Sequence, residues 1–246
     1  MSYFLSDLLS QDEQGGTKLY WAARNNRIAE FEQLIKSGKE MGVLKTLIEK
    51  KHDIGNTPLK TASSKGNIEI VKILLQHKAS IDEANNRGFT PLMSAAEGGH
   101  LDVVMLLLEH NANLQLTTND GATALYIAIQ YGQKDVVETL VSSGDKINKL
   151  DFKNYTALHC AARNGKHEIV EWMLEKPTTK CIINDKSNEY RDTPLIVAIQ
   201  YKGDLAMVKL LVSGGADAGI KGAGKTPLET AKKKRKNDIV EYLESL

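Results

Sequence analysis

Several residue types are scarce in this chain of 246 residues, and each scarcity excludes a class of protein. Two cysteines are too few for a disulfide framework, so a small secreted scaffold held together by bridges is not expected. Only 5 prolines and 6% aromatic residues, beside plentiful Leu, Ile, Ala and Lys, argue against a β-sandwich. The same composition favours helices.

An excess of charge of either sign is also lacking. The chain has 32 Lys and Arg against 31 Asp and Glu, which gives a formal net charge of +1. Binding to nucleic acid or to an anionic membrane surface needs a basic excess, so neither partner is expected. With 41% hydrophobic and 26% charged residues, the composition is typical of a soluble globular chain.

Long apolar runs are missing as well. No stretch approaches the roughly 18 apolar residues that a membrane span requires. The first residues, Met1–Asp7, have no basic segment of the kind that opens a secretory signal. We therefore expect a cytoplasmic protein.

The chain does contain a sequence pattern that recurs at a nearly constant spacing. A threonine opens Thr-Pro-Leu or Thr-Ala-Leu six times, and a degenerate copy starts at Thr17; the six are Thr57, Thr90, Thr123, Thr156, Thr193 and Thr226. The spacing is 33 residues, except for 37 between Thr156 and Thr193 and 40 between Thr17 and Thr57. An alanine follows five residues after each threonine, and a glycine recurs at Gly66, Gly99, Gly132 and Gly165. Self-similarity of this kind indicates a repeat protein.

Each repeated position has a physical reason. Threonine is a good N-cap, because its hydroxyl accepts a hydrogen bond from the first turn of a helix, and proline is suited to the next position. The recurring glycine suits a left-handed cap at the end of that short helix. Apolar residues at helical spacing follow, as in Ile68, Val71 and Leu74. One unit is therefore predicted to be a turn and two antiparallel helices.

Two segments show the pattern most completely: Thr90-Pro91-Leu92 with Gly99-His100-Leu101-Asp102-Val103-Val104, and Thr156-Ala157-Leu158-His159-Cys160-Ala161. They resemble the ankyrin repeat, and the resemblance covers residues 17–246. It implies an all-α solenoid of paired antiparallel helices with β-turn or hairpin loops, slightly curved, with about seven repeats. The repeats would start near residues 12, 52, 85, 118, 151, 188 and 221 of a single domain, and residues 1–16 would be an N-terminal extension or cap.

The resemblance also implies a function. Ankyrin proteins mostly bind other proteins on a concave face of turn tips and first helices, without catalysis. We therefore expect an adaptor, scaffold or inhibitor that is no enzyme, has no cofactor, binds another protein and is monomeric by itself. Two alternatives stay open: a host-directed effector of an intracellular bacterium, delivered into a host cell, and a regulatory subunit of a separate enzyme.

Candidate binding residues are those that the repeat pattern leaves free. Aromatic residues and arginine are the usual anchors of protein interfaces, and several fall at such positions in the third to sixth repeats. The candidates are Arg87, Phe89, Glu97, Gln130, Tyr131, Phe152, Tyr155, Arg163, Tyr190, Gln200 and Tyr201. The alternative is that some rings fold over and pack against an adjacent turn.

A basic run, Lys232-Lys233-Lys234-Arg235-Lys236, lies in the last repeat. It has the composition of a nuclear import signal or of a patch for an acidic partner. The alternative is a solvated face, because the terminal repeat of a solenoid needs a polar surface. Nuclear localisation therefore stays open beside the cytoplasm.

Two further motifs suggest chemistry that their surroundings do not support. Residues 219–226 fit the P-loop expression, whose mechanism needs a preceding buried strand, but Met207–Val212 is predicted to be the second helix of the sixth repeat. His159, Cys160, His167 and Cys181 fit no established zinc spacing, and His159 is expected to brace the turn of its own repeat. We predict no metal site and no catalytic residue.

The pattern also has departures. Seven extra residues fall around Glu40–Lys50 and four around Lys176–Asn188, and we expect them to form loops or to lengthen a helix. Near the N-terminus, the apolar residues Tyr3, Phe4, Leu5, Leu8 and Leu9 are expected to pack over the first repeat, and the alternative is a free interaction motif. Trp21 and Trp172 are both expected to be partly buried.

Overall fold

The computed structural model describes residues 5–147, 154–186 and 188–246. Within these residues the secondary structure comprises sixteen α-helices and one 3-10 helix without a strand, and an isolated bridge joins Gly222 and Lys225. None of the described helices has the length and apolar character that crossing a bilayer requires. The chain divides into two compact units, residues 1–127 and 128–246, and each is described by itself.

Unit 1 contains the first eight helices and the start of the ninth. They are α1 Leu5–Leu9, α2 Lys18–Arg24, α3 Ile28–Glu40, α4 Leu44–Glu49, α5 Pro58–Lys65, α6 Ile68–Gln76, α7 Pro91–Gly98, α8 Leu101–Glu109 and α9 Ala124–Tyr131. Unit 2 contains the rest. They are α10 Lys134–Ser142, α11 Ala157–Asn164, α12 His167–Leu174, the 3-10 helix η1 Pro177–Cys181, α13 Pro194–Tyr201, α14 Leu205–Ser213, α15 Pro227–Lys234 and α16 Asn237–Glu244.

The helices begin and end where the sequence predicts. Each of the seven periodic threonines caps a first helix with its hydroxyl; that of Thr57, for example, accepts from the backbone N–H of Lys60 at 3.2 Å. Gly66, Gly99 and Gly165 end theirs in the left-handed region, with φ of 70°, 70° and 65°. In the last repeat Arg235 occupies this position with φ of 57°. The left-handed conformation costs a residue with a side chain about 1 kcal/mol or more.

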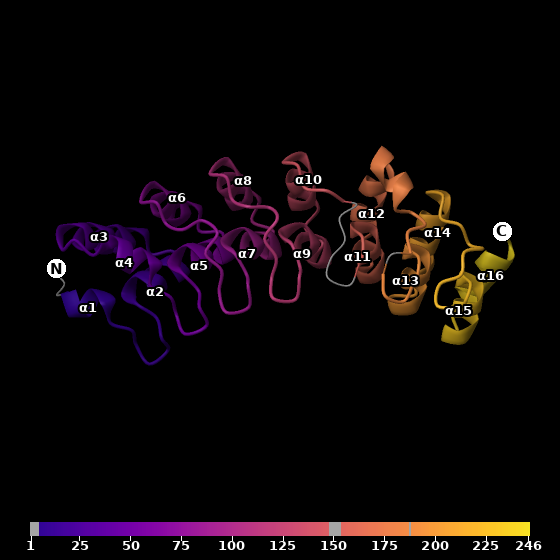
Figure 1. Ribbon diagram of the computed structural model, residues 1–246, viewed down its shortest axis with the longest axis horizontal. Helices are drawn as coiled ribbons and strands as arrows, with labels where there is room; N and C mark the ends of the chain where they lie inside the picture. Colours follow the sequence, from indigo (N-terminus) through magenta and orange to yellow (C-terminus); the bar gives the residue numbers. More distant parts are fainter. Residues whose placement is uncertain (1–4, 148–153, 187) are drawn as a thin grey trace. The chain divides into compact units, whose positions relative to one another are not determined.

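Two rows of helices form unit 1. The first helices α2, α5 and α7 pack side by side, and the second helices α3, α6 and α8 form a second row, which is drawn above them in Figure 1. Ala62 and Ala95 are fully buried, and their small side chains let neighbouring first helices approach closely. Leu59 and Leu74 fill the space between the rows.

Unit 2 repeats this arrangement. The first helices α11, α13 and α15 pack in one row, and the second helices α12, α14 and α16 pack in another. Leu158, Leu195, Val208 and Leu211 lie fully buried between them. The fold of each unit is therefore a stack of helix pairs with a continuous apolar core.

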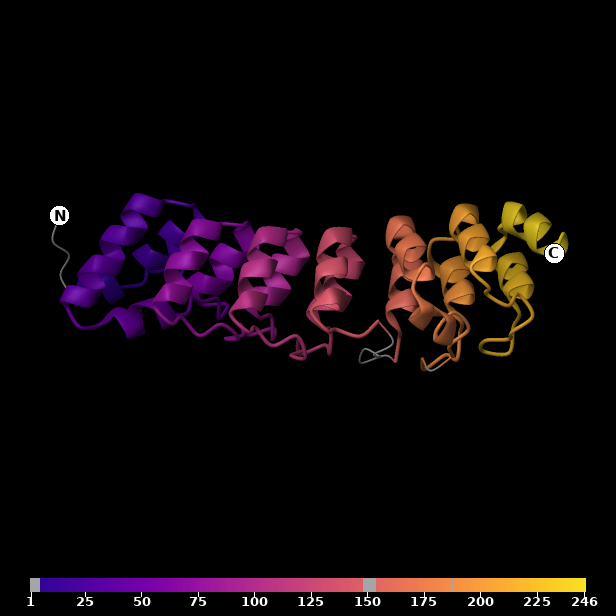
Figure 2. The same cartoon turned by 90° about the horizontal axis from the view of Figure 1, so that it is seen from above.

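The turns that precede the first helices of unit 1 project to one side of the helix rows (Figures 1 and 2). Neighbouring turns are hydrogen-bonded to each other: the backbone N–H of Asn86 donates to the carbonyl of Ile54 at 3.3 Å, and that of Asn119 donates to the carbonyl of Arg87 at 3.1 Å. Lys51 reaches from one turn to the Ala84 carbonyl of the next at 3.2 Å. Neighbouring turns are therefore joined by hydrogen bonds and are not independent loops.

The inserted residues form helical structure. The first insertion extends α3 to Glu40 and adds α4, whose Glu49 accepts from the backbone N–H and hydroxyl of Ser80 at 2.8 and 2.9 Å. The second insertion contains η1. In α1, Leu8 is fully buried as expected, but Leu5 is 51% exposed, which the packing prediction did not foresee; Tyr3 and Phe4 lie outside the described residues. Trp21 and Trp172 are half-buried, as predicted.

Candidate functional site

A repeated side-chain contact organises one face of the first helices in unit 2. In the fifth and sixth repeats, the residue before the capping threonine meets the residue two positions after the alanine. Tyr155 lies under Arg163 in the fifth repeat, with 5.9 Å from the guanidinium carbon to the ring centre. In the sixth, Gln200 donates to Asp192 at 2.8 Å. We call the surface formed by Arg163, Gln200, Tyr131 and Tyr201, all on first helices, the first-helix face of unit 2.

Arg163 and Tyr201 form the most defined feature of this face. The guanidinium carbon of Arg163, on α11, lies 4.4 Å from the centre of the Tyr201 ring, on α13. This is a cation–π contact. The Tyr201 side chain remains 48% exposed, whereas Arg163 is half-buried. The pair therefore presents a positioned aromatic ring to solvent.

Tyr155 corrects one sequence prediction. We expected an exposed anchor, but the side chain is only 3% exposed. Its ring packs edge-on against His159, with the ring centres 5.4 Å apart, and burial raises the pKa of the Tyr155 hydroxyl to about 12. Tyr155 is a packing residue, because its side chain folds back over the helix that follows it.

Asp192 is a buried acid that the sequence reasoning missed. Asp192 directly precedes Thr193, the same repeat position that Tyr155 and Phe89 occupy before their own threonines. This shared position is the sequence feature that could have identified Asp192 as a candidate. Its carboxyl group is almost completely buried, which raises its pKa. His159 braces its own turn through Thr156, as predicted, and also meets the Asp192 carbonyl of the next repeat at 2.9 Å.

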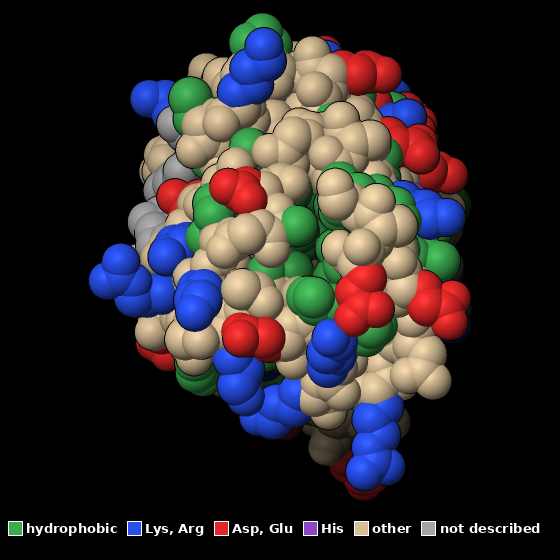
Figure 3. Space-filling model, turned by 90° about the vertical axis from the view of Figure 1, so that its right-hand side faces the viewer, with side chains coloured by type: hydrophobic (Ala, Val, Ile, Leu, Met, Phe, Trp, Pro, Cys, Tyr) green, Lys and Arg blue, Asp and Glu red, His purple; other side chains and the backbone are tan. Residues whose placement is uncertain are grey.

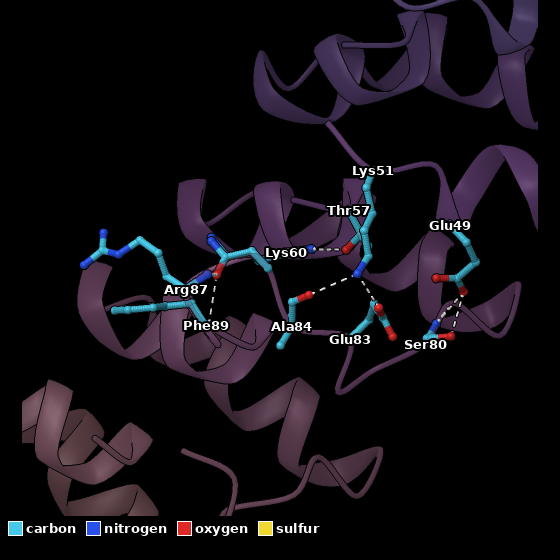
Figure 4. A network of polar contacts seen from close by, with 10 residues as sticks. Glu49, Lys51, Thr57, Lys60, Ser80, Glu83, Ala84, Arg87 and Phe89 are labelled. Carbon is cyan, nitrogen blue, oxygen red and sulfur yellow. Dashed lines mark hydrogen bonds and ion pairs between the residues drawn. The ribbon is translucent and has the colours of Figure 1, made fainter. Parts of the chain in front are cut away.

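Two of the candidates of unit 1, Arg87 and Phe89, are drawn with Lys60 in Figure 4. The guanidinium carbon of Arg87 lies 5.1 Å from the centre of the Phe89 ring, and Phe89 is half-buried. Lys60 is 7% exposed, and burial lowers its pKa to about 8 although the Glu97 carboxylate opposes this shift. Arg87 therefore lies against Phe89, and the charges of Arg87 and Glu97 both act on Lys60, a residue that the sequence did not mark.

The remaining candidates lie at separate points. Gln130 and Tyr131 are exposed at the end of α9, beside a hollow of about 340 Å³ that Tyr131 lines with residues 165–169. Tyr190 is 56% exposed in the turn before α13. Phe152 lies outside the described residues. Ile54, which is 55% exposed, was missed because the sequence reasoning favoured aromatic side chains, although it lies one period before Arg87.

The basic run is folded into the last helix pair. Lys232, Lys233 and Lys234 form the last turn of α15, and Arg235 and Lys236 connect it to α16. Lys232 forms an ion pair with Glu244 at 2.7 Å. The segment that fits the P-loop expression follows α14 rather than a strand, so it lacks the structural context of a phosphate loop.

The stacked helix pairs of both units define a repeat protein. The family described as ankyrin repeats (3 copies) matches residues 19–118, 79–151, 111–187 and 146–222, so the chain belongs to the ankyrin repeat family. Ankyrin repeats are protein–protein interaction modules, and the fold is generally a non-catalytic scaffold. No protein with a curated description matches the sequence.

Two solved structures illustrate the relationship. One is a chain of the complex of the Bd0816 predatory endopeptidase from Bdellovibrio bacteriovorus with immunity protein Bd3460, at 33% identity and a TM-score of 0.68. The match covers 78% of this chain and 98% of that one. The other is the human ASB11 ankyrin repeat domain, at 22% identity and a TM-score of 0.77, covering 92% of this chain and 97% of that one. The second likeness shows the fold alone.

Proposed function

We propose that this protein binds a partner protein, without catalysis, through the first-helix face of unit 2. The observation that carries the proposal is the Arg163–Tyr201 pair, in which a half-exposed ring is held by a guanidinium at 4.4 Å. Tyrosine and arginine are enriched among the residues that dominate binding energies. A ring already held in place loses less conformational freedom on binding than a mobile one.

Among adaptor, scaffold and inhibitor, the proposal favours the inhibitor. Its support is the 33% identity to a chain of a complex between an endopeptidase and an immunity protein. In that reading the partner is an enzyme, and the first-helix face would cover part of it. A regulatory subunit of a separate enzyme would use the same face.

The test removes two exposed rings and measures capture of the partner. The double variant Tyr131→Ala, Tyr201→Ala should lose the partner that wild-type protein captures from a lysate of the source cells. Truncation of a central interface ring costs about 2 kcal/mol or more. The melting temperature should change little, because surface substitutions away from packing contacts cost within about 0.5 kcal/mol.

The matched control removes exposed apolar groups elsewhere. Leu5→Ala with Met105→Ala changes side chains that are 51% and 41% exposed in unit 1. This control should retain the partner. Retention by the tyrosine variant, or equal loss in both variants, would contradict the proposal.

A further inference from the structure

Arg163 differs from every other arginine of the chain in its surroundings. It is half-buried, whereas the five other arginines are exposed. Its guanidinium carbon lies 4.4 Å from the centre of the Tyr201 ring and 5.9 Å from that of the Tyr155 ring, so the group lies against two rings. A guanidinium held in this way keeps its planar array of N–H donors in one orientation.

The N–H donors of Arg163 lack an acceptor within the described ranges. Across residues 5–147, 154–186 and 188–246, no group accepts a hydrogen bond from this guanidinium and no carboxylate forms an ion pair with it. By contrast, Arg27 in unit 1 is exposed and has Glu30 at 3.3 Å. A partly buried charge without a counter-charge costs free energy, and an anion that pairs with it recovers part of that cost.

Two acids beside this face are engaged in other contacts. Asp192 is 2% exposed and accepts from Gln200 at 2.8 Å. The Asp204 carboxylate lies 2.6 Å from the His167 imidazole and also caps α14. Neither carboxylate is therefore available to Arg163.

The cations of the last repeat are in a different situation. On the face at the C-terminal end of the chain, Asp and Glu side chains lie among the Lys and Arg side chains (Figure 3). Lys232, for example, forms an ion pair with Glu244 at 2.7 Å. Positive charge at this end of unit 2 is therefore partly balanced by acids of the same repeat, whereas the charge of Arg163 is not.

We propose that the Arg163 guanidinium binds a carboxylate of the partner protein, from an Asp or Glu side chain, while the exposed Tyr201 ring packs against the apolar part of the same segment. This inference rests on the proposed function and adds the chemical group that the partner presents. A guanidinium can hold both oxygens of a carboxylate with two parallel hydrogen bonds, which adds geometric specificity to affinity. Complementary charge also guides the association of the two proteins.

The first experiment uses the full chain with sodium acetate as the carboxylate probe, at an ionic strength kept constant with sodium chloride. The Nε–H resonances of the six arginines are followed by NMR, and that of Arg163 is identified by its absence from Arg163→Lys. It should shift saturably, at a midpoint at least about fivefold below that of any other arginine, because its guanidinium is already held in place.

Arg27, which has Glu30 beside it, is the internal control of this titration. Equal midpoints for Arg163 and Arg27 would show a general effect of the anion and overturn the proposal. A saturable response of Arg163 to methyl phosphate, with none to acetate, would also overturn it, because the site would then be specific for a phosphoryl group.

Two variants test the part played by the Tyr201 ring. Tyr201→Leu should weaken acetate binding at Arg163 at least about threefold, because the guanidinium loses a ring that holds it. Tyr201→Phe keeps the ring and should stay within about twofold of wild type. Unchanged binding in Tyr201→Leu would contradict a site built from both side chains.

The second experiment measures the apparent affinity for the captured partner. Arg163→Lys keeps the charge but loses the planar pair of donors, so it should weaken binding at least about tenfold, as should Arg163→Gln. The matched control is Arg191→Lys, which changes an exposed arginine in the turn before α13 and should stay within about twofold of wild type. Wild-type affinity in Arg163→Lys would overturn the proposal.

The two proposals fail in distinguishable ways. If the tyrosine double variant loses the captured partner while Arg163→Gln retains it, the binding face stands and the carboxylate assignment is wrong. If both variants retain the partner, the proposed binding face itself is wrong, and the carboxylate assignment fails with it. Loss in both, together with a selective acetate response of the wild type, supports both.

Discussion

Lys60 shows how one residue can oppose the stability of its own repeat. It occupies the position that His159 has in the fifth repeat, where the imidazole bonds to Thr156. A lysine there carries its charge into a site that is 93% closed to solvent, since only 7% of the residue is exposed. Burial therefore lowers its pKa from 10.5 to about 8.

Lys60→Met should stabilise the protein at pH 7. Below pH 8 the lysine is protonated in both the folded and unfolded states, so the folded state bears the full cost of the buried charge. Between about pH 8 and 10.5 the folded state releases the proton first, so the wild type gains stability as pH rises. Removing the charge should raise the free energy of unfolding by about 1–3 kcal/mol at pH 7, and the gain should shrink at pH 10.

Urea unfolding at both pH values measures this difference. The control is Lys65→Met, an exposed residue at the end of the same helix, which should change stability little at either pH. A loss of stability in Lys60→Met at pH 7 would show that the attraction between Lys60 and the Glu97 carboxylate outweighs the cost of burial.

At the scale of the element, the turns depend on glycines for two separate reasons. Gly88 has φ of 78°, and a Cβ there would lie 2.6 Å from the backbone N of Asn119 in the next turn. Gly42 has φ of 69° with nothing within 4 Å of an added Cβ. At both positions the left-handed backbone would strain any residue with a side chain, but at Gly88 the next turn also lies in close contact.

Gly88→Ala should therefore destabilise the protein more than Gly42→Ala. The left-handed backbone makes each substitution cost about 1 kcal/mol. At Gly88 the crowding adds a further 1–3 kcal/mol or so, and it disturbs the hydrogen bond from Asn119 to the Arg87 carbonyl. Urea denaturation of the two variants compares the costs directly, and equal losses would mean that the turns separate without penalty.

At the scale of the whole molecule, we propose that residues 17–246 unfold as one domain. The 33-residue period continues through the boundary between the two compact units, which falls inside α9. In repeat proteins each repeat is stabilised by its neighbours, so an uninterrupted array unfolds cooperatively when the coupling is strong.

The two tryptophans report on the units separately, because Trp21 lies in unit 1 and Trp172 in unit 2. Fluorescence of Trp21→Phe and of Trp172→Phe should give the same urea midpoint after correction for the stability of each variant. A calorimetric enthalpy equal to the van't Hoff enthalpy is the second check. Two midpoints would show that the units unfold independently.

The sequence by itself determined the helix pairs, their caps and their period. Thr57 acts through its own hydroxyl and Gly66 through its own backbone, each on residues close by in the chain, so the sequence alone predicts their roles. The family follows from the same local pattern. It also marked Arg87, Arg163, Tyr190 and Tyr201 as side chains that packing does not require.

Only the tertiary structure decided which of those side chains meet and which face solvent. Tyr155 and Tyr201 look equivalent in the sequence, yet one is 3% and the other 48% exposed. The reason is that a ring beside a turn is covered by whatever volume the next repeat, some 33 residues away, places against it. Likewise, the pairing of Lys232 with Glu244 depends on how α15 packs against α16, which no local pattern specifies.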